Sequence, residues 1–327
     1  MRMTLLLVLA AGVLAVPAAP AQAQVATCDF LPVTISGTSG ADHITGTPGN
    51  DVIAAGAGND RVTGLGGNDV VCLGPGNDSF SGGAGNDRVV AEAIVDGADG
   101  FDGGSGVDTA RYLARTSAVD VSLDGVADDG AAGEGDNNHA DVENIDGAQV
   151  GSRLRGNDAN NVLNGSAGND TILGVGGSDL IRGGPGTDTI SPGAGDDFVV
   201  GGTGNDTVIA AIAAVDGADW FDGGVGVDTA SYSARTTAVN VSLDGIANDG
   251  APGEDDNNLT TVENVVGGTG NDTLVARNTV VRSTLFGGQG NDILIVNDNG
   301  SGDTVNGSFG VDLCAADPGD TKISCEI

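Results

Sequence analysis

A nine-residue repeat is the feature that most constrains the fold of this chain. An aspartate recurs at every ninth position over residues 42–87 and again over residues 170–206. In the first run, glycine stands two residues before each aspartate and an apolar residue stands two residues after it, as in G-G-A-G-N-D-R-V-V at 82–90. Tandem repeats with a short period are typical of stacked architectures, in which each repeat buries its apolar side chain only against its neighbours.

Each nonapeptide divides into a turn and a very short strand. Glycine permits positive φ, and asparagine and aspartate accept local backbone hydrogen bonds, so the first six positions suit a turn. The last three positions suit a strand with one inward aliphatic side chain. Because one such strand buries almost nothing alone, successive strands must pair in parallel and align their side chains in a ladder. We therefore predict an all-β solenoid.

Composition and charge exclude several other classes of protein. The 327 residues include 58 glycines and only 10 aromatic residues, which argues against a conventional packed core. The hydrophobic content of 39% is too high for a disordered acidic tail. A net charge of −34 excludes phosphate-backbone binding as a main activity, because affinity for nucleic acid depends on Lys and Arg. The natural partner of this surface is a cation.

The consensus G-G-x-G-N-D-x-U-x, where U is aliphatic or aromatic, resembles the RTX nonapeptide of the hemolysin-type calcium-binding repeat family. The resemblance covers most of the chain, in about 16 copies. It implies a right-handed parallel β-roll, a form of β-helix, in which two nonapeptides make one turn and calcium lies between loops. Family members often append the repeats to a protease, lipase, epimerase or pore-forming toxin. In this chain the repeats run from about Gly37 to the end of the sequence, so we expect a repeat-only member.

The sixth position of each repeat supplies the candidate metal ligands. Calcium prefers roughly six to eight oxygen ligands from carboxylates and carbonyls, and a glycine-rich turn lets carbonyls point at one centre. If 18 residues form a turn, Asp42 faces Asp60 and Asp170 faces Asp188 across multiple Ca²⁺ ions. The candidate calcium ligands are Asp42, Asp51, Asp60, Asp69, Asp78, Asp87, Asp108, Asp170, Asp179, Asp188, Asp197, Asp206, Asp228, Asp272, Asp292 and Asp312. Because these carboxylates repel one another without metal, we predict that calcium binding drives folding.

Two segments interrupt the repeats, and they are copies of each other. Residues 95–130 and 215–250 align at an offset of 120 residues, and the alternating stretches 119–123 and 239–243 each predict a half-buried strand. The inserts also carry acids, which we interpret as solvated acidic loops in preference to an additional calcium site. These acids are Asp124, Asp128, Asp129, Glu134 and Asp136 in the first insert, and Asp244, Asp249, Glu254, Asp255 and Asp256 in the second.

After the first insert the nine-residue register resumes with altered ligands. Glu143, Ser152 and Asn161 take the sixth position, while the apolar eighth position is kept. We predict that the coils at Ser152 and Asn161 are structural turns with weak or no metal binding. The two histidines, His43 and His139, are interpreted as surface residues and not as ligands or bases.

The N-terminus predicts export. The apolar run 5–16 is too short for a bilayer-spanning helix and precedes A-x-A spacing that ends at residue 23, as in a Sec-type signal peptide; a retained anchor and lipidation at Cys28 are minority alternatives. The expected divisions are a signal peptide 1–23, an N-terminal cap 24–36, β-roll block 1 at 37–90, insert 1 at 91–146, β-roll block 2 at 147–210, insert 2 at 211–266, β-roll block 3 at 267–313 and a C-terminal cap 314–327.

Four cysteines in an exported chain predict disulfides, and four cysteines allow three connectivities. Cys314 and Cys325 lie close together in the sequence, which leaves Cys28 to pair with Cys72. Free thiols are the alternative.

The sequence contains no metalloprotease or nucleophile-elbow motif. The predicted function is therefore that of a secreted calcium-binding repeat protein and not an enzyme, without nucleic-acid binding or membrane insertion. One rival is a calcium-dependent adhesion or glycan-binding protein that contacts a cell-surface partner through Trp220, Phe221, Tyr112 or Tyr232. Clustered exposed aromatics would favour that rival, whereas buried aromatics would favour a structural role. A second rival is a calcium-dependent extracellular enzyme with an acidic pocket in an insert.

Overall fold

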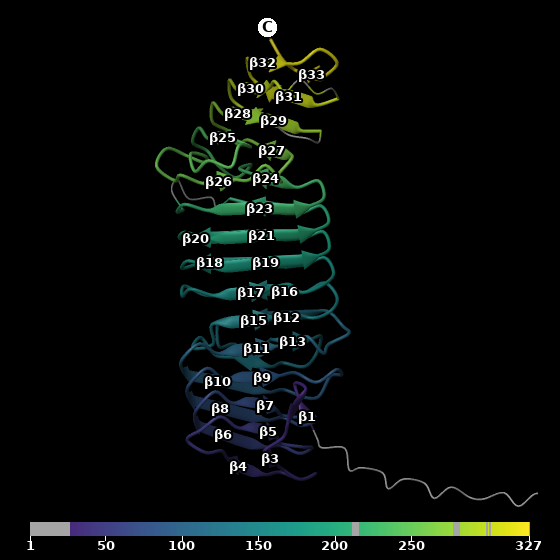
Figure 1. Cartoon of the computed structure of the whole chain (residues 1–327), viewed down its shortest axis with the longest axis vertical. Helices are drawn as coiled ribbons and strands as arrows, with labels where there is room; N and C mark the ends of the chain where they lie inside the picture. The colour runs from purple at the N-terminus through teal and green to yellow at the C-terminus, as the bar shows by residue number, and fades with distance from the viewer. Residues whose placement is uncertain (1–26, 211–215, 277–281, 299, 301, 327) are drawn as a thin grey trace, which may run out of the picture.

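The protein is a solenoid of short strands that stack along one long axis from the N-terminal to the C-terminal end (Figure 1). The computed structural model describes residues 27–210, 216–276, 282–298, 300 and 302–326. In these ranges the regular elements are all strands, which confirms the predicted all-β parallel solenoid. The signal-peptide prediction falls outside the described residues. No helix in the described part of the chain is long and apolar enough to span a membrane.

Four sheets form the faces of the rod, and neighbouring strands within each sheet are hydrogen-bonded to one another. In spatial order, sheet 1 contains β14 (Asn137–Asn138), β10 (Gly100–Ser105), β8 (Ser79–Ala84), β6 (Arg61–Gly66) and β4 (His43–Thr45). Sheet 2 contains β26 (Asn257–Asn258), β23 (Trp220–Val225), β21 (Phe198–Thr203), β19 (Leu180–Pro185), β17 (Val162–Asn164), β15 (Asn144–Asp146), β11 (Thr109–Arg111), β9 (Arg88–Val90), β7 (Val70–Cys72), β5 (Val52–Ala54) and β3 (Ile35–Ser36).

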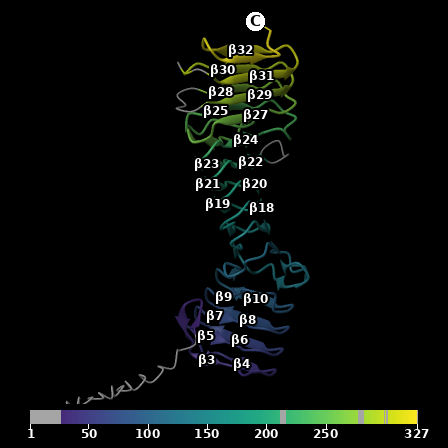
Figure 2. The same cartoon turned by 90° about the vertical axis from the view of Figure 1, so that its right-hand side faces the viewer.

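Sheets 3 and 4 complete the two faces toward the C-terminus (Figure 2). Sheet 3 contains β13 (Gly130–Ala131), β12 (Val119–Ser122), β16 (Arg153–Arg155), β18 (Thr171–Gly176), β20 (Thr189–Ala194), β22 (Thr207–Ile209), β24 (Thr229–Ser231), β27 (Asn264–Val266), β29 (Thr284–Gln289), β31 (Thr304–Phe309) and β33 (Thr321–Ile323). Sheet 4 contains β25 (Asn240–Ser242), β28 (Thr273–Ala276), β30 (Ile293–Val296) and β32 (Leu313–Ala316). A separate antiparallel hairpin joins β1 (Thr27–Cys28) to β2 (Leu31–Pro32).

The register of the parallel pairs sets the length of one turn. Ile172 pairs with Ile190, 18 residues later, as the repeat predicts. Toward the C-terminus the turn lengthens, and Leu285 pairs with Val305, 20 residues later. At the first insert the step becomes 35 residues, from Ala110 to Ile145, because the insert loops out between two coils. Nonapeptides therefore alternate between the two faces, and two of them complete each turn.

The core is a narrow ladder made from the eighth position of each repeat. Ile53, Ile172, Ile181 and Ile190 are fully buried, and each lies within a short strand. At the first insert, two stacked aromatic rings of Phe80 and Phe101 continue the ladder. Because each strand contributes so few apolar side chains, hydrophobic burial per residue is small and neighbouring coils depend on one another.

Each insert ends one sheet and starts another. The predicted strands are present: β12 opens sheet 3 and β25 opens sheet 4. In the first insert β14 pairs with β10 and ends sheet 1, whereas sheet 2 continues from β11 to β15. In the second insert β26 ends sheet 2, whereas sheet 3 continues from β24 to β27. Strands β10 and β11, within residues 91–146, keep the solenoid register and belong to regular coils.

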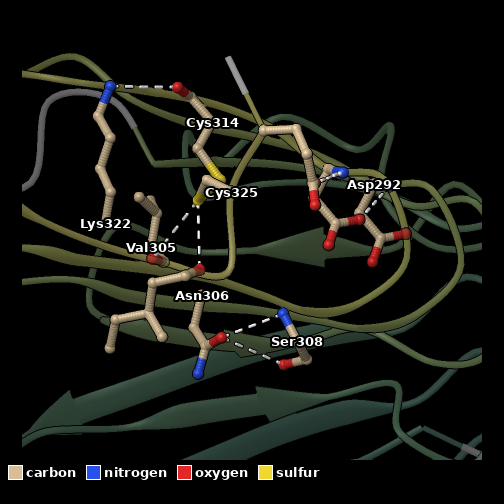
Figure 3. The surroundings of a disulfide bond; sticks show 10 residues. Asp292, Val305, Asn306, Ser308, Cys314, Lys322 and Cys325 are labelled. Atoms are coloured by element: carbon tan, nitrogen blue, oxygen red, sulfur yellow. Dashed lines mark hydrogen bonds between the residues drawn. A yellow bond between two sulfur atoms is a disulfide. The ribbon is translucent and has the colours of Figure 1, made fainter.

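Both ends of the rod carry a disulfide, and the two pairs are those that the sequence suggested. Cys28 pairs with Cys72 and thereby fixes the N-terminal hairpin to sheet 2. Cys314 pairs with Cys325 at the C-terminal end, where the Lys322 ammonium donates a hydrogen bond to the Cys314 carbonyl at 3.2 Å (Figure 3). No free cysteine is present in the described residues.

Candidate metal centres

The sixth-position aspartates stack into ladders along the edges of the solenoid. In each step, one carboxylate oxygen, Oδ1, accepts a hydrogen bond from the backbone N–H of the aspartate one turn earlier. The N–H of Asp42 donates to Asp60 at 2.7 Å, and the N–H of Asp170 donates to Asp188 at 2.8 Å. The predicted facing pairs are therefore in contact, and the same step also joins Asp87 to Asp108 across 21 residues.

The second carboxylate oxygen of most ladder aspartates is buried and has no hydrogen-bond partner. A buried anionic oxygen without a partner costs several kcal/mol, of the order of 2–7, so a native fold requires that something else satisfy it. Of the 16 predicted aspartates, 13 carry such an Oδ2: Asp60, Asp69, Asp78, Asp87, Asp108, Asp170, Asp179, Asp188, Asp197, Asp206, Asp228, Asp292 and Asp312.

Backbone carbonyl oxygens approach the same place. A Cβ atom built on Gly64 would lie 2.2 Å from Asp69 Oδ2 and 2.5 Å from the carbonyl oxygen of Gly82, one turn later. On Gly183 it would lie 2.3 Å from Asp188 Oδ2 and 2.6 Å from a carbonyl oxygen of the next coil. The glycine thus leaves room for carboxylate and carbonyl oxygens to converge, and these hard oxygens are the donors that calcium prefers. The donor set therefore fits Ca²⁺.

Without a cation, burial makes these carboxylates resist ionisation. Desolvation raises the pKa of Asp69 to about 6, and the neighbouring charges of Asp87 and Asp51 contribute to the rise. The pKa of Asp170 rises to about 7 for the same reason, with Asp188 as the neighbouring charge. Backbone N–H donors oppose the shift but do not cancel it. A bound divalent cation would reverse this balance because it favours the charged form.

Three of the predicted aspartates differ from the others because they begin a ladder. Asp42 and Asp51 accept hydrogen bonds on Oδ2 from the backbone and hydroxyl groups of Thr38 and Thr47. Asp272 accepts one on Oδ2 from the N–H of Gly268 at 2.7 Å. Their second oxygens are satisfied by the protein, so the need for a cation is weakest at these ladder starts.

The altered coils at Ser152 and Asn161 are satisfied without metal. The Ser152 hydroxyl accepts the N–H of Ala148 at 3.0 Å. The Asn161 amide accepts the N–H of Asn157 at 2.9 Å and donates to the Glu143 carbonyl at 2.9 Å. This arrangement supports the prediction that both are structural turns.

Sequence reasoning missed several members of the ladders. Asp99 accepts from the N–H of Asp78 at 2.9 Å, and Asp219 accepts from that of Asp197 at 3.0 Å. The pattern G-x-D-x-U marks both, but each lies outside the nine-residue count. At the ladder ends, acids from outside the consensus accept the last N–H, as Glu143 does from Asp108 and Glu263 does from Asp228.

Asp303 is a third ladder member that the repeat search passed over. It accepts from the N–H of Ser283 at 2.8 Å and keeps an unpartnered Oδ2. It lies nine residues before Asp312 and two before an apolar residue, but it lacks the glycine two positions earlier. A search on the spacing and the apolar position alone would have found it.

The interpretation of the insert acids as solvated loops is wrong for six of the ten. Asp124, Asp128, Asp244 and Asp255 are exposed, but the other six side chains are buried because each insert folds back over the end of a sheet. The buried acids are Asp129, Glu134 and Asp136 in the first insert, and Asp249, Glu254 and Asp256 in the second.

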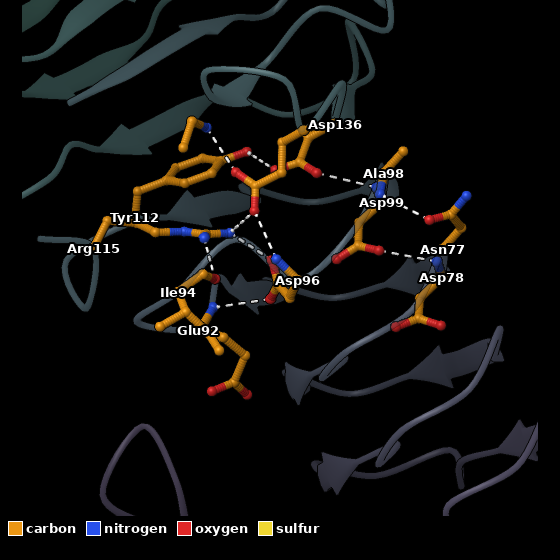
Figure 4. Close-up of polar contacts among 12 residues, drawn as sticks. Asn77, Asp78, Glu92, Ile94, Asp96, Ala98, Asp99, Tyr112, Arg115 and Asp136 are labelled. Carbon is orange, nitrogen blue, oxygen red and sulfur yellow. Dashed lines mark hydrogen bonds and ion pairs between the residues drawn. The ribbon is translucent and has the colours of Figure 1, made fainter. Parts of the chain in front are cut away.

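A buried arginine holds each insert in place. Arg115 lies 2.6 Å from Asp96 and 2.5 Å from Glu134, with all three side chains almost fully buried (Figure 4). Asp136 accepts the N–H of Asp99 at 3.0 Å and the hydroxyl of Tyr112 at 3.3 Å. The second copy repeats the contacts, with Arg235 at 2.5 Å from both Asp216 and Glu254. These networks attach the insert to the coil and give the acids a structural role.

Most of the aromatic residues considered for partner binding are buried. Tyr112, Phe221 and Tyr232 are each 3% exposed, and only Trp220 is 36% exposed, where it packs edge-on against Phe198. This arrangement favours a structural role over an exposed aromatic binding surface.

The repeats, the parallel coils and the aspartate ladders define a class of calcium-binding β-solenoid. A family model for the RTX calcium-binding nonapeptide repeat matches residues 36–71, 74–93, 155–190, 173–208, 261–278 and 282–300. The chain belongs to the RTX calcium-binding nonapeptide repeat family.

No curated protein matches the chain. Among solved structures, the chain is similar to an X-ray crystal structure of a hyperactive, Ca²⁺-dependent, β-helical antifreeze protein from an Antarctic bacterium. The two are 20% identical, the match covers 85% of each chain, and the TM-score is 0.28. A TM-score this low carries no argument about the present protein.

Proposed function

We propose that this is a secreted calcium-binding protein whose solenoid folds when Ca²⁺ fills the aspartate ladders. The observation that carries the proposal is the row of buried Oδ2 atoms without partners, each beside a backbone carbonyl of the next coil. Export is supported by the apolar run 5–16 and by two disulfides, which form in oxidising compartments. The proposal assigns no catalytic role to any residue.

The ladder residues themselves explain why folding and binding are coupled. Their Oδ1 atoms accept backbone N–H groups and fix the loops one turn apart, while their Oδ2 atoms collect negative charge in the same loops. Calcium, when bound, supplies the positive charge and the missing coordination for those oxygens. In the unfolded chain the paired loops do not exist, so binding free energy becomes folding free energy.

Circular dichroism and a matched pair of variants test this proposal. We expect a disordered far-UV spectrum in EGTA and a β-rich spectrum in millimolar calcium. Asp188→Asn should lower the stability of the calcium-saturated protein by about 1–3 kcal/mol, because one site is lost. The same change should stabilise the calcium-free chain, because an amide nitrogen beside the Gly201 carbonyl can donate where Oδ2 cannot.

Asp128→Asn is the control, because Asp128 is exposed and the charge change is identical. It should shift stability by no more than about 0.5 kcal/mol in either condition. A spectrum that does not change between EGTA and calcium would contradict the proposal, as would equal effects of Asp188→Asn in both conditions.

A further inference from the structure

Three metal-ligating side chains from two segments meet on the outer surface of the first insert. Asp102 lies in β10, and His139 and Asp141 follow β14. One ligand atom from each lies within 4.8 Å of the others. The backbone holds them there: the N–H of His139 donates to the Phe101 carbonyl at 3.0 Å, and the N–H of Gly104 donates to the Asp141 carboxylate at 2.9 Å. None of the three belongs to the calcium-ligand set proposed above.

The second insert has the same backbone arrangement and a different chemistry. The equivalent residues are Asp222, Leu259 and Thr261, and the N–H of Leu259 donates to the Phe221 carbonyl at 3.0 Å. The Thr261 hydroxyl donates to Asp222 at 2.7 Å and accepts the N–H of Gly223 at 3.1 Å. In this copy the aspartate has a neutral donor beside it, so the contact is complete without a cation.

In the first insert a second carboxylate replaces that donor. Asp102 and Asp141 approach within hydrogen-bonding reach of each other, so one proton or one cation must lie between them. The contact with Asp141 raises the pKa of Asp102, followed by desolvation, while the charge of His139 opposes the rise. A hollow of about 210 Å³ adjoins Asp102 and His139, and Arg61 also lines it. Among the described residues, Arg61 makes no ion pair with either carboxylate.

We propose that Asp102, His139 and Asp141 bind one divalent transition-metal cation of the Zn²⁺ type, and that the second insert does not. The imidazole nitrogen decides the class of metal, because Ca²⁺ takes oxygen ligands whereas zinc accepts nitrogen and carboxylate oxygen together. Zinc bonds of roughly 2.0–2.2 Å are compatible with ligand atoms this close once the exposed imidazole rotates. Three protein ligands leave a fourth coordination position open to water or to a ligand from solution.

The duplicated insert supplies both the loss and the gain variants for the test. Zn²⁺ is titrated calorimetrically into the full chain in saturating calcium, which keeps the ladder sites occupied. His139→Leu with Asp141→Thr converts the first insert to the chemistry of the second and should abolish one zinc equivalent. Leu259→His with Thr261→Asp performs the reverse change and should add one equivalent. Proton NMR of the two histidines should show a zinc-dependent shift for His139, with His43 as the internal reference.

The proposal is overturned if the loss variant binds zinc with the stoichiometry and affinity of the parent protein. It is also overturned if zinc leaves the His139 resonances unchanged. Should the loss variant fail to fold in calcium, the gain variant decides the question, since an unchanged zinc stoichiometry there contradicts the proposal. The calcium-induced circular dichroism change is followed in parallel. Its loss would refute calcium-driven folding and would not by itself affect the zinc site.

Discussion

At the scale of single residues, the first glycine of a repeat is the position least able to accept a side chain. We predict that Gly64→Ala lowers the stability of the calcium-saturated protein by about 1–3 kcal/mol, because its Cβ would lie 2.2 Å from Asp69 Oδ2 and 2.5 Å from a backbone carbonyl. The change should also weaken calcium binding at that loop. Urea unfolding at fixed calcium measures the first effect, and calorimetry measures the second.

Gly40→Ala is the matched control for this substitution. A Cβ on Gly40 would have no heavy atom within 4 Å, and neither Gly40 nor Gly64 has positive φ. Its stability should stay within about 0.5 kcal/mol of the parent protein. Equal losses in the two variants would mean that backbone propensity, and not the crowded oxygen site, sets the cost.

The sequence predicts which residues form the ladders better than it predicts their individual states. The aspartate at a sixth position, followed by an apolar residue two positions later, is enough to place Asp69 or Asp188. It does not show that Asp42 and Asp51 are satisfied by threonines, because those hydrogen bonds depend on how the first coils end. Asp99 was missed because three extra residues separate its coil from the previous one, so a search by strict count passes over it.

At the scale of elements, each insert depends on its buried arginine. Arg115→Ala should destabilise the protein by about 3–5 kcal/mol, because it leaves Asp96 and Glu134 buried without their cation. Hydrogen exchange should show the loss first in β12 to β14, which the arginine holds against the coil. The exposed pair between Arg155 and Asp124 spans 3.7 Å, so Arg155→Ala should cost less than about 1 kcal/mol. Comparable exchange rates in the two variants would refute the anchoring role.

The duplication of the inserts is visible in the sequence, and so is the alternation that predicts β12 and β25. Their buried clusters are not, because the partners of Arg115 come from positions 19 residues to either side and meet only after the insert folds back. Acid-rich loops in an acidic protein are usually solvated, and nothing local distinguishes Glu134, which is 7% exposed, from the exposed Asp128.

At the scale of the whole molecule, the ladders give calcium-free and calcium-bound protein opposite responses to pH. The pKa of Asp69 rises to about 6 and the pKa values of Asp170 and Asp197 rise to about 7, chiefly through burial, against 3.8 for an ordinary aspartate. The folded chain therefore holds protons that the unfolded chain has released. Without calcium, this contribution to stability is complete below about pH 4 and is lost as the pH rises through 6 to 7.

Calcium binding requires ionised carboxylates and releases those protons, so affinity rises over the same interval. In EGTA, we expect the midpoint of thermal unfolding to fall between about pH 4.5 and about pH 8, and in saturating calcium we expect it to rise. Melting curves at several pH values in each condition measure both slopes. Slopes of the same sign would show that the ladder carboxylates do not exchange protons for calcium.

The way each insert ends one sheet and opens another has a consequence for the geometry of the rod. The first insert lies at the junction of sheets 1 and 3 while sheet 2 runs past it, and the second lies at the junction of sheets 2 and 4 while sheet 3 runs past it. The two copies therefore project from different faces. A duplication at an offset of 120 residues has produced alternation and not a comb: any molecule that recognised both inserts would approach from two directions, and one rod would bridge two such molecules.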